Sequence, residues 1–126
     1  MTSKTFVTAI NCMDGRTQEP IIKWAKEKFN ADYIDAITEP GPDKILSEGP
    51  ENLINSIKNR VKISIEKHNS ENIIIVSHHD CAGNPVDREK HLEQLKKSLM
   101  KIKSWGFNVN IVGVWIDENW AVNEIG

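Results

Sequence analysis

Two short segments of this sequence combine side chains that can bind metal ions or transfer protons. In "SHHDCAGNP", Ser77 to Pro85, two histidines, an aspartate and a cysteine follow the apolar run "NIIIV". In "NCMDGR", Asn11 to Arg16, the other cysteine of the chain follows the apolar run "TFVTAI". The two cysteines of the sequence, Cys12 and Cys81, therefore both come directly after stretches that are typical of strands.

Cys12, His78 and Cys81 together form a ligand set that suits zinc. Thiolates and imidazole are usual zinc ligands, and three protein ligands leave a fourth position open, as catalytic zinc sites do. One turn could supply both His78 and Cys81, and Cys12 would complete the set from a neighbouring strand. The alternative is that the cysteines are unrelated core residues, because free cysteine is among the most frequently buried residue types.

Asp14 and Arg16 are candidates for the chemistry at that open position. An aspartate beside it can accept a hydrogen bond from zinc-bound water and so orient the water toward an electrophile. An arginine forked onto the same carboxylate would hold it ionised and fix its direction. The alternative is a surface ion pair, which contributes under about 1 kcal/mol.

The elements expected around these segments alternate between strands and helices. Apolar runs predict strands over Thr5–Ile10, Asp32–Ile37, Asn72–Val76 and Val109–Ile116. Between them, apolar residues at helical spacing predict three helices. These stripes comprise Ile21, Ile22, Ala25 and Phe29; Leu53, Ile57, Val61 and Ile65; and Leu92, Leu95, Leu99 and Ile102.

Proline and glycine indicate where these elements begin and end. Pro20 and Pro50 suit the first turns of the first and second helices, and Gly106 suits the end of the third. The segment "EPGPDK", Glu39 to Lys44, is predicted to be a rigid loop that continues neither neighbouring element.

This alternation predicts an α/β fold in which a mostly parallel sheet of about four to five strands is flanked by helices. We expect residues 1–126 to form a single domain. Ligands in open α/β sheets bind beyond the carboxyl ends of the strands. Cys12 and Cys81 fall at that edge of the predicted sheet, which favours a metal or catalytic role over two unrelated core positions.

Composition excludes several classes of function. The net charge of −2 gives no basic field for nucleic acid or for an anionic membrane. The segment "MTSKTFVTAI" lacks the apolar stretch of a signal peptide, and no run approaches the roughly 18 apolar residues of a membrane span. We therefore expect a cytoplasmic protein, in which a structural disulfide is not expected.

The segments "CMDGR" and "SHHDCAG" resemble the two signature segments of the β-class carbonic anhydrases, Cys-x-Asp-x-Arg and His-x-x-Cys. Gly83 also fits, and the order of strands and helices and the segment "VNIVGVWID" are similar to the family. The resemblance implies that Cys12, His78 and Cys81 bind zinc. It also implies that Asp14 either orients the zinc-bound hydroxide or, in a closed state, occupies the fourth position until Arg16 releases it.

The reaction implied by the resemblance is reversible hydration of carbon dioxide to bicarbonate by zinc-bound hydroxide. The family resemblance also implies a homodimer or a higher homo-oligomer acting on a small-molecule substrate. The family's usual Arg-Asn-Ala-Gly segment is replaced here by "TEPGPDK", Thr38 to Lys44. Two alternatives therefore stay open: a zinc protein without catalysis, and a zinc hydrolase acting on a related electrophile such as carbonyl sulfide or carbon disulfide.

Other polar and aromatic residues receive weaker interpretations. Cysteine-nucleophile phosphatase chemistry needs an arginine that follows the cysteine after five intervening residues, which neither cysteine has. His79 is a candidate for lining the pocket or carrying protons, against plain exposure, and Asp80 for capping the turn. His68 and His91 are predicted to face solvent. The four tryptophans are predicted to make core or subunit contacts: Trp24, Trp105, Trp115 and Trp120.

Overall fold

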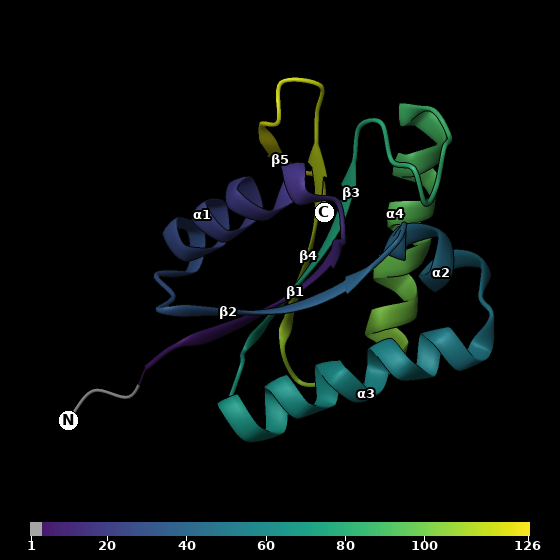
Figure 1. The fold of residues 1–126 in the computed structure, drawn as a ribbon. Coiled ribbons are helices and arrows are strands. Elements are labelled where there is room, and N and C mark those ends of the chain that lie inside the picture. The colour runs from purple at the N-terminus through teal and green to yellow at the C-terminus, as the bar shows by residue number, and fades with distance from the viewer. Residues whose placement is uncertain (1–3) are drawn as a thin grey trace.

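A five-stranded sheet with helices on both faces forms the centre of the molecule (Figure 1). The computed structural model describes residues 4–126. The strand order is β2-β1-β3-β4-β5, and the four strands β1 to β4 run parallel while β5 pairs antiparallel with β4. The α/β fold with a mostly parallel sheet is therefore confirmed.

The four predicted strands are present, and three of them extend further than the sequence indicated. Cys12 and His78 are the last residues of their strands rather than the residues that follow them. The short antiparallel strand at the edge was not predicted, because its three partly exposed residues carry no apolar pattern. The strands are β1 (Phe6–Cys12), β2 (Tyr33–Glu39), β3 (Asn72–His78), β4 (Asn110–Ile116) and β5 (Val122–Glu124).

The three predicted helices are also present, and Gly106, with φ of 78°, follows the end of the third as expected. The prediction that Glu39 to Lys44 is a loop is wrong at both ends, because Glu39 is the last residue of β2 and a helix begins at Pro42. Proline suits the first turn of a helix, where its missing N–H would have no partner in any case. The helices are α1 (Gln18–Phe29), α2 (Pro42–Glu48), α3 (Glu51–His68) and α4 (Arg88–Ser104), with a short 3-10 turn η1 (Gly15–Thr17).

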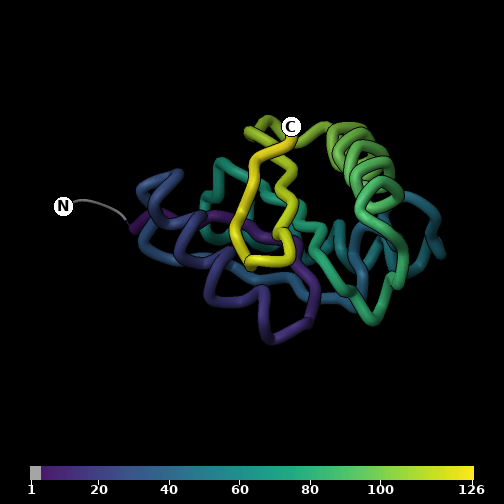
Figure 2. Tube along the Cα trace, turned by 90° about the horizontal axis from the view of Figure 1, so that it is seen from above, coloured from purple at the N-terminus to yellow at the C-terminus, as the bar shows by residue number. Residues whose placement is uncertain are grey.

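Successive side chains along each strand point to opposite faces of the sheet, so the core is divided into two clusters, one on each face. Ile73 and Ile75 of β3 pack with α2, α3 and α4 on one face, and Ile74 and Val76 pack with α1 on the other. Figure 2 shows α1 and α4 on opposite sides of the sheet. A strand that is buried on both faces is continuously apolar, which explains the run "NIIIV". The tryptophans are buried or pack against these clusters: Trp24, Trp105, Trp115 and Trp120.

No helix within residues 4–126 combines the length and the hydropathy that are needed to cross a membrane.

The loops after β2 and β3 touch through two glycines. A Cβ atom on Gly83 would lie 2.6 Å from the carbonyl carbon of Pro40, so no larger residue fits there without a shift of the backbone. Gly41 has φ of 64°, and a Cβ atom on it would lie 2.8 Å from the Cβ of Asn84. This close approach packs the loop that carries Cys81 against the loop that leads from β2 into α2.

The prediction that His91 faces solvent is wrong, because its side chain is only 1% exposed. Its Nδ1 lies 2.6 Å from Oδ2 of Asp43, which is also buried, and the pair joins α4 to α2. His91 lies one helical turn before Leu95, so the stripe on α4 could have revealed its burial. His68 is exposed, as predicted, and its Nδ1 lies 2.7 Å from Oδ2 of Asp35.

Gly83→Ala should destabilise the protein by about 1–3 kcal/mol, because the methyl group would collide with backbone atoms that cannot rotate away. Thermal unfolding of this variant should give a lower Tm than the wild type. The matched control is Gly15→Ala, since a Cβ atom on Gly15 would have nothing within 4 Å. Equal Tm values for the two variants would show that the two loops are not in such close contact.

Stability should depend on pH through Asp43. Burial raises the pKa of Asp43, but hydrogen bonds from His91, Ser77 and Asn84 and the charge of His91 outweigh burial and hold it below its ordinary value. The ionised carboxylate therefore stabilises the fold at all pH values above the unfolded pKa of about 3.9, and this contribution is lost as pH falls through the lower folded value.

Asp43→Asn should accordingly lower the free energy of unfolding by about 3 kcal/mol near neutral pH, because it leaves buried donors without their charged acceptor. Urea unfolding from pH 3 to 7 would measure the difference from the wild type. We expect the difference to be constant above pH of about 5 and to shrink below pH of about 4. A difference that widens in acid would contradict a depressed pKa.

Candidate metal centre

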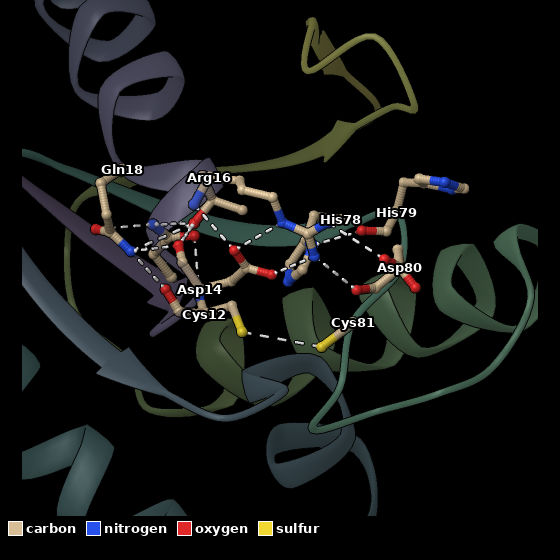
Figure 3. Close-up of polar contacts among 10 residues, drawn as sticks. Cys12, Asp14, Arg16, Gln18, His78, His79, Asp80 and Cys81 are labelled. Carbon is tan, nitrogen blue, oxygen red and sulfur yellow. Dashed lines mark hydrogen bonds and ion pairs between the residues drawn. The ribbon is translucent and has the colours of Figure 1, made fainter.

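The structure brings the three predicted zinc ligands together at the carboxyl end of the sheet (Figure 3). Cys12 ends β1, His78 ends β3, and Cys81 follows β3 after a turn. One ligand atom from each residue lies within 4.8 Å of the others, and all three residues are buried. Parallel neighbouring strands end at the same edge of a sheet, which explains why side chains 69 positions apart in the chain meet.

The spacing and the polar contacts of these side chains fit a zinc ion. The Sγ atoms of Cys12 and Cys81 are 3.8 Å apart. Two sulfurs bound tetrahedrally at the usual zinc–sulfur distance would be separated by about 3.8 Å. The Nδ1 of His78 donates a hydrogen bond to the backbone carbonyl of His79 at 2.7 Å. Its Nε2 is buried and has no hydrogen-bond partner among residues 4–126. A nitrogen that binds a metal ion would lack a hydrogen-bond partner when the ion is absent.

The two thiols interact strongly with each other. A hydrogen bond from Cys81 lowers the pKa of Cys12 below its ordinary value, in spite of burial. The pKa of Cys81 is raised, because the neighbouring Cys12 thiolate and burial both oppose a second negative charge. A divalent cation between the sulfurs would remove this repulsion and stabilise both thiolates.

Asp14 and Arg16 form a forked ion pair next to this group. Nε of Arg16 donates to Oδ1 of Asp14 at 3.1 Å and Nη2 donates to Oδ2 at 2.7 Å. The backbone N–H of Arg16 also donates to Oδ1, which caps the turn η1 and orients the carboxylate. Hydrogen bonds and charge from Arg16 outweigh partial burial and lower the pKa of Asp14 to about 2. Asp14 is therefore ionised at neutral pH.

Contacts from two other segments hold Arg16 in place. Its guanidinium lies 4.5 Å from the ring centre of Trp120, in the turn between β4 and β5. Nη1 donates to the carboxylate of Asp80 at 3.2 Å, and Nη2 donates to the Asp80 carbonyl at 3.1 Å. The carboxylate of Asp80, which sequence reasoning treated as a cap for its turn, instead binds Arg16.

Each cysteine lines a different cavity. One, of about 320 Å³, is lined by Cys12, Asp14 and the loops around Pro40 and Gly83. The other, of about 660 Å³, is lined by Cys81, Arg16 and His79 among others. Asp14, which is ionised, and Cys12 therefore line the same cavity. His79 is exposed, which was the alternative, and it also lines the larger cavity.

Sequence reasoning missed the buried polar side chains that contact the segment carrying His78 and Cys81. Asp43, in α2, accepts hydrogen bonds from Ser77 and Asn84, which lie on either side of His78 and Cys81. Asp43 stands in the segment that was predicted to be a loop, so no pattern marked it as buried. Its position just after Pro42, in the first turn of a helix, was the available signal.

Comparisons with known proteins were informative at the levels of family and fold. The family described as "Putative carbonic anhydrase" matches residues 2–126. A comparison with curated proteins gives no match. One similar solved structure is of a β-carbonic anhydrase from the filamentous ascomycete Sordaria macrospora, where two such enzymes are described as tetrameric. It has a TM-score of 0.56 at 13% identity, and the match covers 99% of this chain and 82% of that chain.

The β-carbonic anhydrase CafA of the fungal pathogen Aspergillus fumigatus is similar at a TM-score of 0.54 and 13% identity, with 98% of this chain and 76% of that chain covered. At such low identity these two likenesses show a common fold. The family match, in contrast, extends over nearly the whole sequence. From that match we conclude that this chain belongs to the family described as "Putative carbonic anhydrase".

Proposed function

We propose that this protein is a zinc-dependent carbonic anhydrase that reversibly hydrates carbon dioxide to bicarbonate, with Cys12, His78 and Cys81 as the zinc ligands. The observation that carries the proposal is the buried cluster itself, with sulfurs 3.8 Å apart and an unpartnered His78 Nε2 within residues 4–126. When bound, zinc supplies a Lewis acid that lowers the pKa of a water ligand toward neutrality from about 15.7. Membership of the family supports the choice of reaction.

Asp14 is proposed to orient the attacking water. Its carboxylate is ionised, and Asp14 lines the same cavity as Cys12, so it can accept a hydrogen bond from water there. Arg16 binds both carboxylate oxygens and so fixes the direction of the remaining lone pairs. This arrangement supports a state in which Asp14 stays on Arg16 rather than taking the fourth zinc position.

We further infer that copies of the chain associate, as a homodimer or a higher oligomer. Support comes from the tetrameric enzymes that share the fold. Large apolar side chains are also exposed, including Met13 at 65% and Met100 at 71%.

Light scattering on the purified protein should therefore give a mass of at least twice the 14.3 kDa of one chain. A mass of one chain at micromolar concentration would contradict association.

Metal content and hydration activity test the main proposal. The wild type should contain about one zinc per chain and should accelerate carbon dioxide hydration in stopped-flow assays. Removal of zinc with a chelator should abolish the activity, and His78→Ala and Cys81→Ser should lose the metal. Asp14→Asn should retain zinc and lose activity by about 10²-fold or more, because it cannot orient water in the same way.

The matched control is Asp80→Asn, which removes the other carboxylate that binds Arg16 but at a position 71% exposed. It should reduce activity far less than Asp14→Asn. A wild type that holds zinc without hydrating carbon dioxide would favour the alternatives, and assays with carbonyl sulfide and carbon disulfide would then separate a hydrolase from a protein without catalysis. A wild type without metal would contradict the proposed centre.

A further inference from the structure

We propose that Asp43 is a positioning residue for the metal centre. It does not contact the metal ligands, but it holds both ends of the segment that supplies His78 and Cys81. This inference rests on the proposed function, because it assigns a role toward the metal that those residues would bind. It concerns affinity and geometry at the metal rather than the stability of the fold alone.

Asp43 binds the segment once before the histidine and once after the cysteine. Ser77, the residue before His78, donates from Oγ to Oδ2 of Asp43 at 2.8 Å. Asn84, three residues after Cys81, donates from Nδ2 to Oδ1 of Asp43 at 3.0 Å. The backbone N–H of Asn84 also donates to the carbonyl of Cys81, at 3.3 Å, so the position of Asn84 is transmitted to the cysteine.

Asp43 can serve as a fixed point because it is itself held from several directions. His91 of α4 contacts Oδ2 at 2.6 Å, and the backbone N–H of Lys44 donates to Oδ1 at 2.9 Å. Ser98 donates from Oγ to the backbone carbonyl of Asp43 at 3.1 Å. Asp43, His91 and Ser98 are each no more than 1% exposed, so water does not compete for these bonds.

The geometry of the strand explains how a bond to Ser77 can direct His78. Successive side chains of a strand point to opposite faces, so Ser77 points toward α2 and α4 while His78 points toward the other face. A strand end that is free to twist would move the imidazole of His78 away from the two sulfurs. The bond from Ser77 to Asp43 restrains that twist from the side of the sheet opposite to the imidazole.

A carboxylate suits this position better than a neutral side chain. Side chains of Ser77, Asn84 and His91 all present hydrogens to it, and an ionised carboxylate is an acceptor at both oxygens. An asparagine there would turn an NH₂ group toward at least one of these donors. Residues that orient metal ligands from outside the coordination sphere change metal affinity by about 10–100-fold when they are replaced.

The test compares two buried serines that each donate to one carboxylate. Ser77→Ala removes the bond to Asp43, and the control Ser64→Ala removes a bond of 2.7 Å from α3 to Asp35 and one of 2.7 Å to Thr8, in another part of the core. The two serines are 2% and 3% exposed. Zinc Kd, from competition with a chelator, and the absorption spectrum of the cobalt(II) form would be measured on folded protein.

Ser77→Ala and Asp43→Asn should each weaken zinc binding by about tenfold or more and should shift the cobalt bands. Ser64→Ala should lower Tm but leave the zinc Kd and the cobalt spectrum as in the wild type. Ser77→Ala leaves the contact between Asp43 and His91 in place. If Asp43→Asn does not fold, the zinc Kd and cobalt spectrum of Ser77→Ala alone therefore test the positioning role.

Wild-type zinc Kd and cobalt spectrum in Ser77→Ala would overturn the positioning role while leaving the proposed function intact. Equal weakening by Ser64→Ala would also overturn it, because the effect would then come from general stability. A wild type that binds neither zinc nor cobalt would overturn both the proposed function and this inference.

Discussion

The candidate centre depends on holding two sulfur atoms and an imidazole together at the carboxyl edge of the sheet, where all three residues are buried. Burial and the neighbouring Cys12 disfavour ionisation of Cys81 and raise its pKa when no cation lies between the two sulfurs. The fold supplies the energy that buries both cysteines with their sulfurs 3.8 Å apart. Strand β3 contributes much of it, because burying a side chain such as Ile73, Ile74 or Ile75 stabilises a fold by about 1.5–3 kcal/mol.

The same sheet explains why its carboxyl edge is suited to the site. Strands β1 and β3 are hydrogen-bonded neighbours that run in the same direction, so Cys12 and His78 end side by side. The close contact of Gly83 with Pro40 then brings the turn that carries Cys81 against the end of β2. Two of the ligands are thus fixed by the regular sheet, and the third is fixed by a contact between loops.

Much of this could be predicted from the sequence, because strand and helix periodicity and the position of the cysteines are local signals. The parallel sheet, the three longer helices and the meeting of both cysteines at one edge follow from such signals. What could not be predicted depends on contacts between distant residues. The helix that begins at Pro42 and the contact of its Asp43 with His91 exist because α2 packs on α4, and no periodic pattern in "EPGPDK" carries that information.

The short strand β5 shows how an element without a sequence signal can still shape the site. Its pairing with β4 turns the chain back so that Trp120 lies over the guanidinium of Arg16 and 6.3 Å from the ring of His78. A cation against an indole face is attracted to it, and the indole also keeps water from one side of the guanidinium. Because Arg16 in turn fixes the direction of Asp14, the orientation of that carboxylate is linked to the far edge of the sheet. The ligands thus come from the ends of the central strands β1 and β3, while the ion pair of Asp14 and Arg16 is held by the turn that leads into the edge strand β5.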